Sequence, residues 1–517
     1  MKTSVSCAPM NPDMNTETYA AIDLGSNSFH LLVVRREHGE LRVLDRIKEM
    51  VRLGGGLDDD GNLDPDTQKR ALDCLARFGQ RLRGIPANNM RAVGTQTFRR
   101  LNNANAFLLA AEQMLECPID IISGREEARL IYMGVTQWVS RSPLKQLVMD
   151  IGGGSTELII GEGFDPVVME SMQFGCVSTT QRFFSDGKIT AKRLRKAKRA
   201  VAAELQEIQS VYRQTGWKRA IGSSGTLRAA ATICVVNGWS KKGITREALE
   251  QLKQKMLTFK RIEDIQIKGL IDQRKPVFIG GLAVIQACFE ALDIEELVIS
   301  PYALREGLLQ DLIGRLEHND PRDLTVKAFM TRFAVDEAQV DRVQTTALKL
   351  YDQLTTDLNL VPGHRKLLAW ASGLHETGLS LSHSSYQQHS AYLVDSSDMA
   401  GFSRQEQLYL ATLVGHQRRG IPTGYTARLP ERLWQGLNIG LICLRLAWVF
   451  CRTRDDEAIP DFQTRLSNNT VSLALPADWM ETHPLTIADL GLEQQALKTT
   501  GLQLKIVFMQ SSPTAAS

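Results

Sequence analysis

The sequence lacks a strong excess of charge of either sign. Its 517 residues include 61 lysines and arginines against 58 aspartates and glutamates, which gives a net charge of +3 at pH 7. Charges so evenly balanced create no global field that would attract nucleic acid. We therefore expect no nucleic-acid partner, and binding of any polyanion must depend on a local basic patch.

Closely spaced cysteines and long apolar runs are also missing. The 8 cysteines are scattered without a CxxC pair, which argues against a disulfide framework or a structural zinc site. The best candidate for a membrane span, Ile439 to Phe450, is short and is interrupted by Arg445. Between Met1 and Asn15 there is no apolar core of a signal peptide. These absences favour a cytoplasmic protein and leave peripheral membrane association open.

The stretch from Leu147 to Ile160 is the most informative, and it predicts two strands joined by a glycine turn. Gly152, Gly153 and Gly154 are followed by Ser155, and glycines let backbone N–H groups crowd around an anion such as phosphate. Asp150 ends the first strand and Glu157 opens the second. Two carboxylates beside a phosphate suit a divalent cation. A hairpin with a purely structural turn is the alternative.

An earlier stretch, from Ala20 to Val34, repeats this plan. Apolar residues and an aspartate lead into Gly25, Ser26 and Asn27, and a second apolar strand follows. A repeated strand–turn–strand unit predicts two similar α/β lobes that hold a phosphate chain between their turns. A third Gly/Ser turn, from Gly222 to Gly225, would supply another anion-binding site.

A helix start is predicted at Ser123, with Glu126 at the capping-box position three residues later. Acidic residues in a first helical turn are favoured by the helix dipole alone. The residues by themselves therefore leave Glu127 open between a structural and a catalytic role.

Two further segments matter for the site: Arg91 to Arg100 predicts a strand that ends in a basic turn, and Gly280-Gly281 predicts a turn before an apolar helix.

Taken together, the two aspartate-containing loops, the segment Ile122 to Tyr132 and the sequence Ala303 to Gly307 resemble the exopolyphosphatase/guanosine pentaphosphate phosphatase family. That family belongs to the superfamily of actin, heat-shock chaperone ATPases and sugar kinases. The resemblance implies an α/β fold of two actin-like, ribonuclease H-like lobes followed by a helical, HD-like domain. We place these at 18–130, 131–314 and 315–445. Alternating patterns near the C-terminus predict a small α+β unit at 446–517.

The resemblance also implies roles for individual residues. The second glutamate of the pair, Glu127, corresponds to the family's proposed general base, and Arg99 and Arg274 match arginines that line its phosphate channel. Mg²⁺ would be held by Asp150 and Glu157, with stimulation by K⁺ as a further expectation. The remaining phosphate-binding candidates are the turn residues Gly25, Ser26, Asn27, Gly152, Gly153, Gly154 and Ser155.

The expected activity is release of terminal phosphate from inorganic polyphosphate by Mg²⁺-assisted attack of water. The alternative is hydrolysis of guanosine 5′-triphosphate 3′-diphosphate (pppGpp) to ppGpp, which would link the chain to the stringent response. Gly175 to Ser178 and Ile221 to Gly225 look closer to the first branch, whereas Arg454 to Asp456 and Trp479 to Leu485 look closer to the second. Dual activity, an actin-like ATPase or kinase, and a non-enzymatic sensor also stay open. The absence of a Walker A sequence decides nothing, because the superfamily does not use one.

Histidines in the C-terminal half are similar to the metal-binding pattern of HD phosphohydrolases. His375, His389 and His416 are present, but Glu376 stands where that pattern has an aspartate, and Leu444 to Trp448 offers no terminal aspartate ligand. A metal site needs most of its ligands, so we expect a degenerate, non-catalytic domain. The family commonly dimerises through its helical domains, which implies a homodimer.

Overall fold

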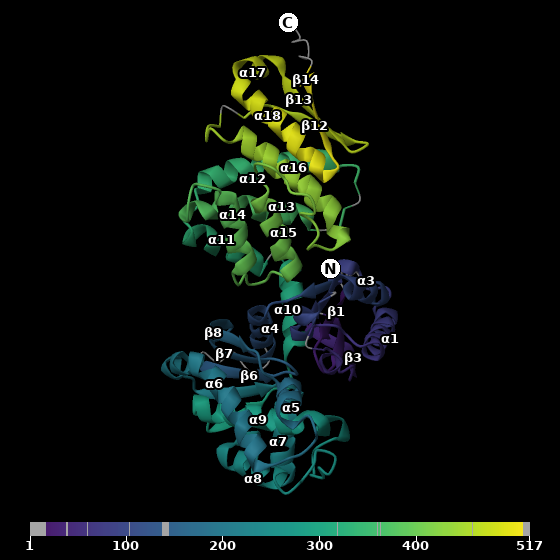
Figure 1. Cartoon of the computed structure of the whole chain (residues 1–517), viewed down its shortest axis with the longest axis vertical. Helices are drawn as coiled ribbons and strands as arrows, with labels where there is room; N and C mark the ends of the chain where they lie inside the picture. The colour runs from purple at the N-terminus through teal and green to yellow at the C-terminus, as the bar shows by residue number, and fades with distance from the viewer. Residues whose placement is uncertain are drawn as a thin grey trace, which may run out of the picture. The chain divides into compact units, whose positions relative to one another are not determined.

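The computed structural model describes residues 17–37, 40–58, 60–102, 104–136, 144–317, 319–358, 360–361, 363–456 and 459–509. They form two units, Met1–Asn319 and Asp320–Ser517 (Figure 1). Met1 to Asn15, where a signal peptide was sought, lies outside the described residues. The four-part division predicted from the sequence stays a prediction, and its boundary at 445 falls within one helix of the second unit.

The first unit begins with a five-stranded sheet in the order β3-β2-β1-β4-β5. Strand β1 pairs antiparallel with β2 and parallel with β4. The helix after the sheet's first three strands starts at Pro65, and Asp64 caps it by accepting a hydrogen bond from the Thr67 N–H at 2.9 Å. The elements are β1 (Glu17–Leu24), β2 (Phe29–Glu37), β3 (Glu40–Glu49), α1 (Pro65–Leu82), β4 (Met90–Gly94), α2 (Gln96–Arg100), α3 (Ala104–Leu115) and β5 (Ile119–Ile121).

A second sheet in this unit has six strands in the order β10-β11-β9-β6-β7-β8. Strand β6 pairs antiparallel with β7 and parallel with β9, so it holds the position that β1 holds in the first sheet. The internal repeat seen in the sequence is therefore a repeat of topology. The strands are β6 (Lys145–Ile151), β7 (Thr156–Glu162), β8 (Asp165–Met172), β9 (Arg219–Ser223), β10 (Ile244–Thr245) and β11 (Glu296–Ile299). The helices are α5 (Cys176–Phe184), α6 (Ala191–Thr215), α7 (Ser224–Val236), α8 (Arg246–Met256) and α9 (Lys275–Leu292).

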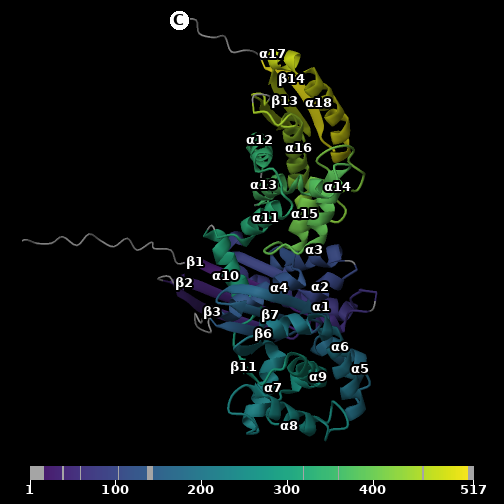
Figure 2. The ribbon, with the colours of Figure 1, turned by 90° about the vertical axis from the view of Figure 1, so that its left-hand side faces the viewer.

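Two helices, α4 (Gly124–Thr136) and α10 (Leu304–Leu316), pack between the sheets. Side chains alternate along each strand, so Leu147 and Met149 of β6 face the core formed with α6 to α9, whereas Val148 faces α4 and α10. Figure 2 shows α7, α8 and α9 together below β6 and β7. Helices α4 and α10 touch through glycine: a Cβ on Gly307 would lie 1.7 Å from the Leu130 carbonyl oxygen. This contact holds the first turn of α10 against the middle of α4.

The second unit consists of helices and a small sheet that share one hydrophobic core. Its strands β13 (Thr470–Pro476) and β14 (Gln503–Met509) confirm two of the predicted strands, and β12 (Gln463–Ser467) completes the sheet. The helices are α11 (Pro321–Arg332), α12 (Glu337–Thr355), α13 (His364–Leu374), α14 (Tyr386–Ser396), α15 (Arg404–Gly415), α16 (Trp434–Phe450), α17 (Ala477–Thr482) and α18 (Pro484–Ala496).

Two local predictions are wrong. The segment from Arg91 to Arg100 is not one strand with a basic turn, because β4 ends at Gly94 and α2 follows it. Gly280-Gly281 is not a turn but lies inside α9. A Cβ on Gly280 would lie 2.2 Å from Thr180 Oγ1, so the glycines are needed for close packing of α9 against α5.

Two segments of the described chain, Asp272–Leu292 and Glu431–Phe450, are long and apolar enough to cross a membrane. In each, 78% of the apolar window is buried inside the protein. Burial of this kind is expected of a core helix.

Candidate active site

Both glycine turns line one cavity of the first unit, with a volume of about 330 Å³. Each turn is closed by an equivalent backbone hydrogen bond. The Gly25 N–H donates to Ser28 O at 3.2 Å, and the Gly152 N–H donates to Ser155 O at 2.9 Å. The two turns face each other closely: a Cβ on Gly153 would lie 2.9 Å from Ser26 Cβ. The cavity brings together nine of the predicted site residues, namely Gly25, Ser26, Asn27, Glu127, Asp150, Gly152, Gly153, Ser155 and Arg274.

Three predicted site residues do not line this cavity. Gly154 packs against α2, where an added Cβ would lie 2.3 Å from Gln96 Oε1. Arg99 Nη1 donates to Ile122 O at 2.7 Å and to Glu127 Oε2 at 3.2 Å, so it braces the candidate base. Glu157 lies beside Asp150 in the β6–β7 register and accepts a hydrogen bond from Ser171 Oγ at 2.9 Å. Their predicted roles with phosphate and metal stay predictions.

The pKa values of three acidic side chains at the site, Glu127, Asp150 and Glu157, are raised above their usual values. Burial raises the pKa of Glu127, against the opposing charge of Arg99. Burial also raises the pKa of Asp150 to about 6, although Ser223 Oγ donates a hydrogen bond to it. For Glu157, burial and then the charges of Glu127 and Asp150 raise the pKa well above its usual value. These carboxylates therefore repel one another in a poorly solvated site.

Asp23 is a pocket residue that the sequence analysis did not name as a site candidate. It lines the cavity, and burial raises its pKa to about 7. The sequence did contain the signal, because Asp23 holds the position in the first hairpin that Asp150 holds in the second. Comparing the two copies position by position would have identified it.

Mg²⁺ fits the donor set of this site. Within the described residues, no group of three or more His, Cys, Asp or Glu side chains could hold a metal ion by itself. Mg²⁺ usually keeps several waters and binds through one or two carboxylates together with substrate phosphates. Asp150 faces the cavity and would supply one such oxygen, while Glu157 would act through water. The positive charge of the ion would relieve the repulsion among the carboxylates.

Several basic residues of the cavity were also missed as site candidates. They come from four separate elements, so no spacing in the sequence connects them, although Arg305 lies in a segment that carries the family resemblance. The Arg305 guanidinium donates to His30 Nδ1 at 2.8 Å, and His30 Nε2 lies 2.8 Å from Ser28 Oγ. Burial and then Arg305 lower the pKa of His30, so its ring is neutral and accepts from the guanidinium. The missed residues are His30, Arg46, Lys48, Arg228 and Arg305.

Arg274 packs against the third Gly/Ser turn. A Cβ on Gly225 would lie 1.6 Å from Arg274 Nη2, so only glycine leaves room for the guanidinium. The Arg274 side chain is buried and still lines the cavity. Its position supports the predicted contact with phosphate, because a guanidinium can bind phosphate oxygens through two parallel hydrogen bonds.

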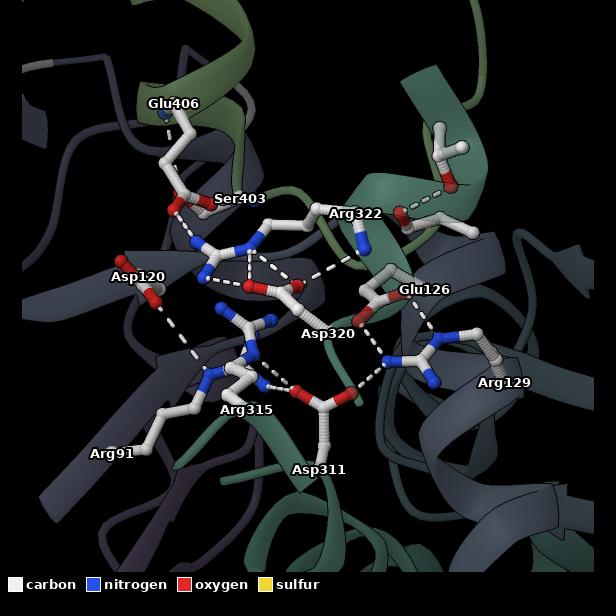
Figure 3. A network of polar contacts seen from close by, with 12 residues as sticks. Arg91, Asp120, Glu126, Arg129, Asp311, Arg315, Asp320, Arg322, Ser403 and Glu406 are labelled. Carbon is white, nitrogen blue, oxygen red and sulfur yellow. Dashed lines mark hydrogen bonds and ion pairs between the residues drawn. The ribbon is translucent and has the colours of Figure 1, made fainter. Parts of the chain in front are cut away.

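A buried ion network supports the helix that carries Glu127 (Figure 3). The Asp311 carboxylate accepts from Arg91, Arg129 and Arg315, and Arg129 also pairs with Glu126 at 2.8 Å. Burial alone would raise the pKa of Asp311, but the three arginines hold it well below its usual range. The network joins β4, α4 and α10, and it thereby fixes the first turn of α4.

In the second unit, two of the residues that are similar to an HD metal site, His375 and Glu376, contact other protein groups. Arg454 Nη2 donates to both carboxylate oxygens of Glu376, at 2.8 and 2.9 Å. His375 is fully buried, and its Nδ1 lies 2.6 Å from the Ser372 carbonyl oxygen. The Glu376 carboxylate is thus already neutralised by a cation of the protein.

Comparison with known proteins identifies two family matches. A model described as the Ppx/GppA phosphatase family matches residues 32–316, and one described as Ppx/GppA phosphatase, domain III, matches residues 322–494. A guanosine-5′-triphosphate,3′-diphosphate pyrophosphatase of Aeromonas hydrophila is 36% identical over 497 residues, covering 95% of this chain and 99% of that protein. A protein of the same description from Photobacterium profundum is 36% identical over 496 residues, covering 95% and 98%.

Solved structures match more than half of the chain. An exopolyphosphatase from Cytophaga hutchinsonii superposes with a TM-score of 0.53 and 24% identity, covering 58% of this chain and 98% of that chain. An exopolyphosphatase-like protein superposes with a TM-score of 0.52 and 27% identity, covering 58% and 99%. These matches confirm the predicted α/β fold class with two actin-like lobes.

Proposed function

The chain belongs to the Ppx/GppA phosphatase family, which makes it a phosphoanhydride hydrolase, and we propose that it removes the terminal phosphate of pppGpp. The observation that carries the proposal is the placement of Glu127 in the same cavity as both glycine turns. Substrate choice rests on the relatives named for pppGpp, whose similarity extends over nearly the whole chain.

We assign a separate role in the reaction to each group of residues in and beside the cavity. Backbone N–H groups of the two turns would bind phosphate oxygens from opposite sides. Glu127, whose pKa is raised by burial, would take the proton from an attacking water, because a base works best with a pKa near the operating pH. Arg99 would keep the Glu127 carboxylate in place. When bound, Mg²⁺ would neutralise developing charge on the phosphate.

Inorganic polyphosphate is the second candidate substrate. Among the described residues that line the cavity there is no Phe, Tyr or Trp to stack on a guanine base. The lining instead combines glycine turns with arginine and lysine, which recognise phosphate groups of either compound. Dual activity is consistent with this lining.

The test compares phosphate release from pppGpp and from long-chain polyphosphate. For Glu127→Gln we expect kcat to fall by about 10²–10⁴-fold on whichever substrate the wild type uses, because the base is lost while shape is retained. Glu290→Gln, which changes an exposed glutamate paired with Lys198, is the control and should match the wild type. Undiminished turnover by Glu127→Gln would move water activation to another residue.

Cofactor, location and assembly belong to the same proposal. We expect an Mg²⁺-dependent cytoplasmic homodimer that is stimulated by K⁺, with peripheral membrane association as an open alternative. Removal of the metal with a chelator should abolish phosphate release, and added Mg²⁺ should restore it. Light scattering of the full chain measures the oligomeric state.

A further inference from the structure

The carbonyl oxygens of the second glycine turn are held by the first turn of α5. The Cys176 N–H donates to Gly152 O at 2.9 Å. The N–H groups of Val177 and Ser178 both donate to Gly153 O, at 2.8 and 3.1 Å. The first N–H groups of a helix have no acceptor within the helix, so they can bind groups outside it. Here those groups are two carbonyls of a turn that lines the cavity.

The first glycine turn is held in the same way by another segment. The Gly54 N–H donates to Ser26 O at 2.8 Å, and the Arg52 N–H donates to Asn27 O at 2.9 Å. Arg52 has a φ of 55°, a left-handed conformation that is strained in residues other than glycine. The backbone is therefore strained at the residue that makes one of these two hydrogen bonds.

The two holding segments occupy equivalent positions in the two lobes. Each follows the third strand of an antiparallel meander, since Arg52 and Gly54 come after β3 and Cys176 comes after β8. The second segment approaches its turn closely: a Cβ on Gly175 would lie 2.5 Å from the Gly153 carbonyl oxygen. The internal repeat thus includes the segment that holds each turn as well as the turn itself.

This arrangement leaves N–H groups of both turns available to a ligand. Asn27 and Gly153 line the cavity, and within the part of the chain that the structure describes no protein group accepts a hydrogen bond from their N–H groups. Backbone N–H groups attract phosphate, whereas a carbonyl oxygen turned toward the same phosphate would repel it. Holding the carbonyls from outside the turn therefore favours phosphate binding.

We propose that the start of α5 and residues 52–54 are positioning segments, which direct the N–H groups of the two glycine turns toward phosphate. This inference rests on the proposed function, because the turns are the phosphate sites of that proposal. The positioning segments act through the backbone of the turns and not through a contact of their own with phosphate. Loss of one holding N–H group should therefore weaken phosphate binding while the lobe stays folded.

Cys176→Pro removes one holding N–H group and puts a ring carbon in its place, so the Gly152 carbonyl has to move. Cys176 is the first residue of α5, where proline is tolerated, and Gly175 before it is extended, with φ −150° and ψ −175°. The reference is Cys176→Ala, which loses the same thiol and keeps the N–H. We expect KM to be about three- to tenfold higher in Cys176→Pro than in Cys176→Ala, with a smaller change in kcat, since one net hydrogen bond is lost.

Ala191→Pro is the control for proline itself. Ala191 is the exposed first residue of α6, and Thr190 before it is also extended, with φ −141° and ψ 152°. This variant should have the KM and the melting temperature of the wild type. If Cys176→Pro and Cys176→Ala have equal KM values on a substrate that the wild type hydrolyses, the inference is overturned and the proposed function stays intact.

A second pair of variants tests the first lobe and decides the question if Cys176→Pro does not fold. In Gly54→Ala the added Cβ would lie 3.2 Å from Ser26 Cβ and 3.4 Å from Ser26 O, so the holding segment should shift relative to the turn. We expect KM to rise about threefold. Gly55→Ala, where an added Cβ meets nothing within 4 Å, should have the KM of the wild type. Equal KM values in this pair would overturn the inference.

A binding experiment separates this inference from the proposed function. Calorimetric titration with inorganic tripolyphosphate should show about three- to tenfold weaker binding to Cys176→Pro than to Cys176→Ala. That difference supports the positioning role even if the wild type hydrolyses neither pppGpp nor polyphosphate, a result that would refute the proposed function alone. Equal affinities of the two variants would overturn the positioning role, and a wild type that binds no tripolyphosphate would overturn both proposals.

Discussion

Arg99 and Glu127 form an ion pair beside the cavity, with Arg99 Nη1 3.2 Å from Glu127 Oε2. The arginine also donates to the Ile122 carbonyl oxygen, so its guanidinium is held in place. Burial raises the pKa of Glu127, and Arg99 supplies the main opposing effect. The pair therefore sets how basic the Glu127 carboxylate is.

Arg99→Met should raise the pKa of Glu127 further, because the ionised carboxylate loses its cation. Only the deprotonated form is a base, so activity at a given acidic pH should fall and should recover at higher pH. We expect the acidic limb of the kcat/KM profile to move upward by about one pH unit. Arg125→Met, which removes a neighbouring cation paired with Glu170, serves as control. An unmoved limb in Arg99→Met would contradict this role.

Asp23→Asn should stabilise the protein at neutral pH while lowering its activity. The folded pKa of about 7 lies above the usual aspartate value of 3.8, so the folded state binds more protons than the unfolded state. Stability is therefore lost as pH rises from about 4 to about 7, and the amide removes that loss. We expect a gain on the order of 3–4 kcal/mol at pH 7, since a difference of one pKa unit corresponds to about 1.4 kcal/mol. Denaturant unfolding at pH 7 and pH 4 measures it; the gain should vanish at pH 4.

Gly225→Ala should displace Arg274, since the added Cβ would lie 1.6 Å from its Nη2 atom. Loss of this guanidinium from the cavity should raise KM about tenfold or more. The control is Gly55→Ala, where an added Cβ meets nothing within 4 Å. Arg274→Met should have the same KM as Gly225→Ala, and the double variant should have no higher KM than either single variant. That result would show that Gly225 affects KM through the position of Arg274. A normal KM in Gly225→Ala would show that Arg274 is not needed in its present position.

Asp311→Asn should destabilise the first unit by about 3–5 kcal/mol, because it leaves several buried arginines without their shared carboxylate. It should also lower kcat, since α4 and Glu127 depend on the same network. Asp272→Asn is the matched control: that carboxylate is exposed and pairs with Lys275, so it should cost less than about 1 kcal/mol. Chemical denaturation measures both changes. Equal stability of the two variants would refute a supporting role for the network.

Prediction from sequence worked best where the signal was local. The two hairpins and the helix start at Ser123 each depend on residues a few positions apart, and the structure confirms them. Prediction from sequence failed for a glycine whose small size is required by a contact with a residue far away in the chain. The sequence predicts a turn at Gly280-Gly281, but in the structure the small size of Gly280 allows α9 to pack against Thr180, which is about a hundred residues away in the chain.

The sequence alone determined the duplicated hairpin and its two glycine turns, because repeats and turn residues are encoded over short distances. The proposal of Glu127 as the base came from the resemblance to the family. Only the tertiary structure decided that Arg99 braces Glu127, that Asp23 lines the same cavity as Asp150, and that Lys48 of β3 lines this cavity together with Arg228 of α7. These relationships depend on how the two sheets enclose α4 and α10. No spacing along the chain records which charged side chains such packing brings into one cavity.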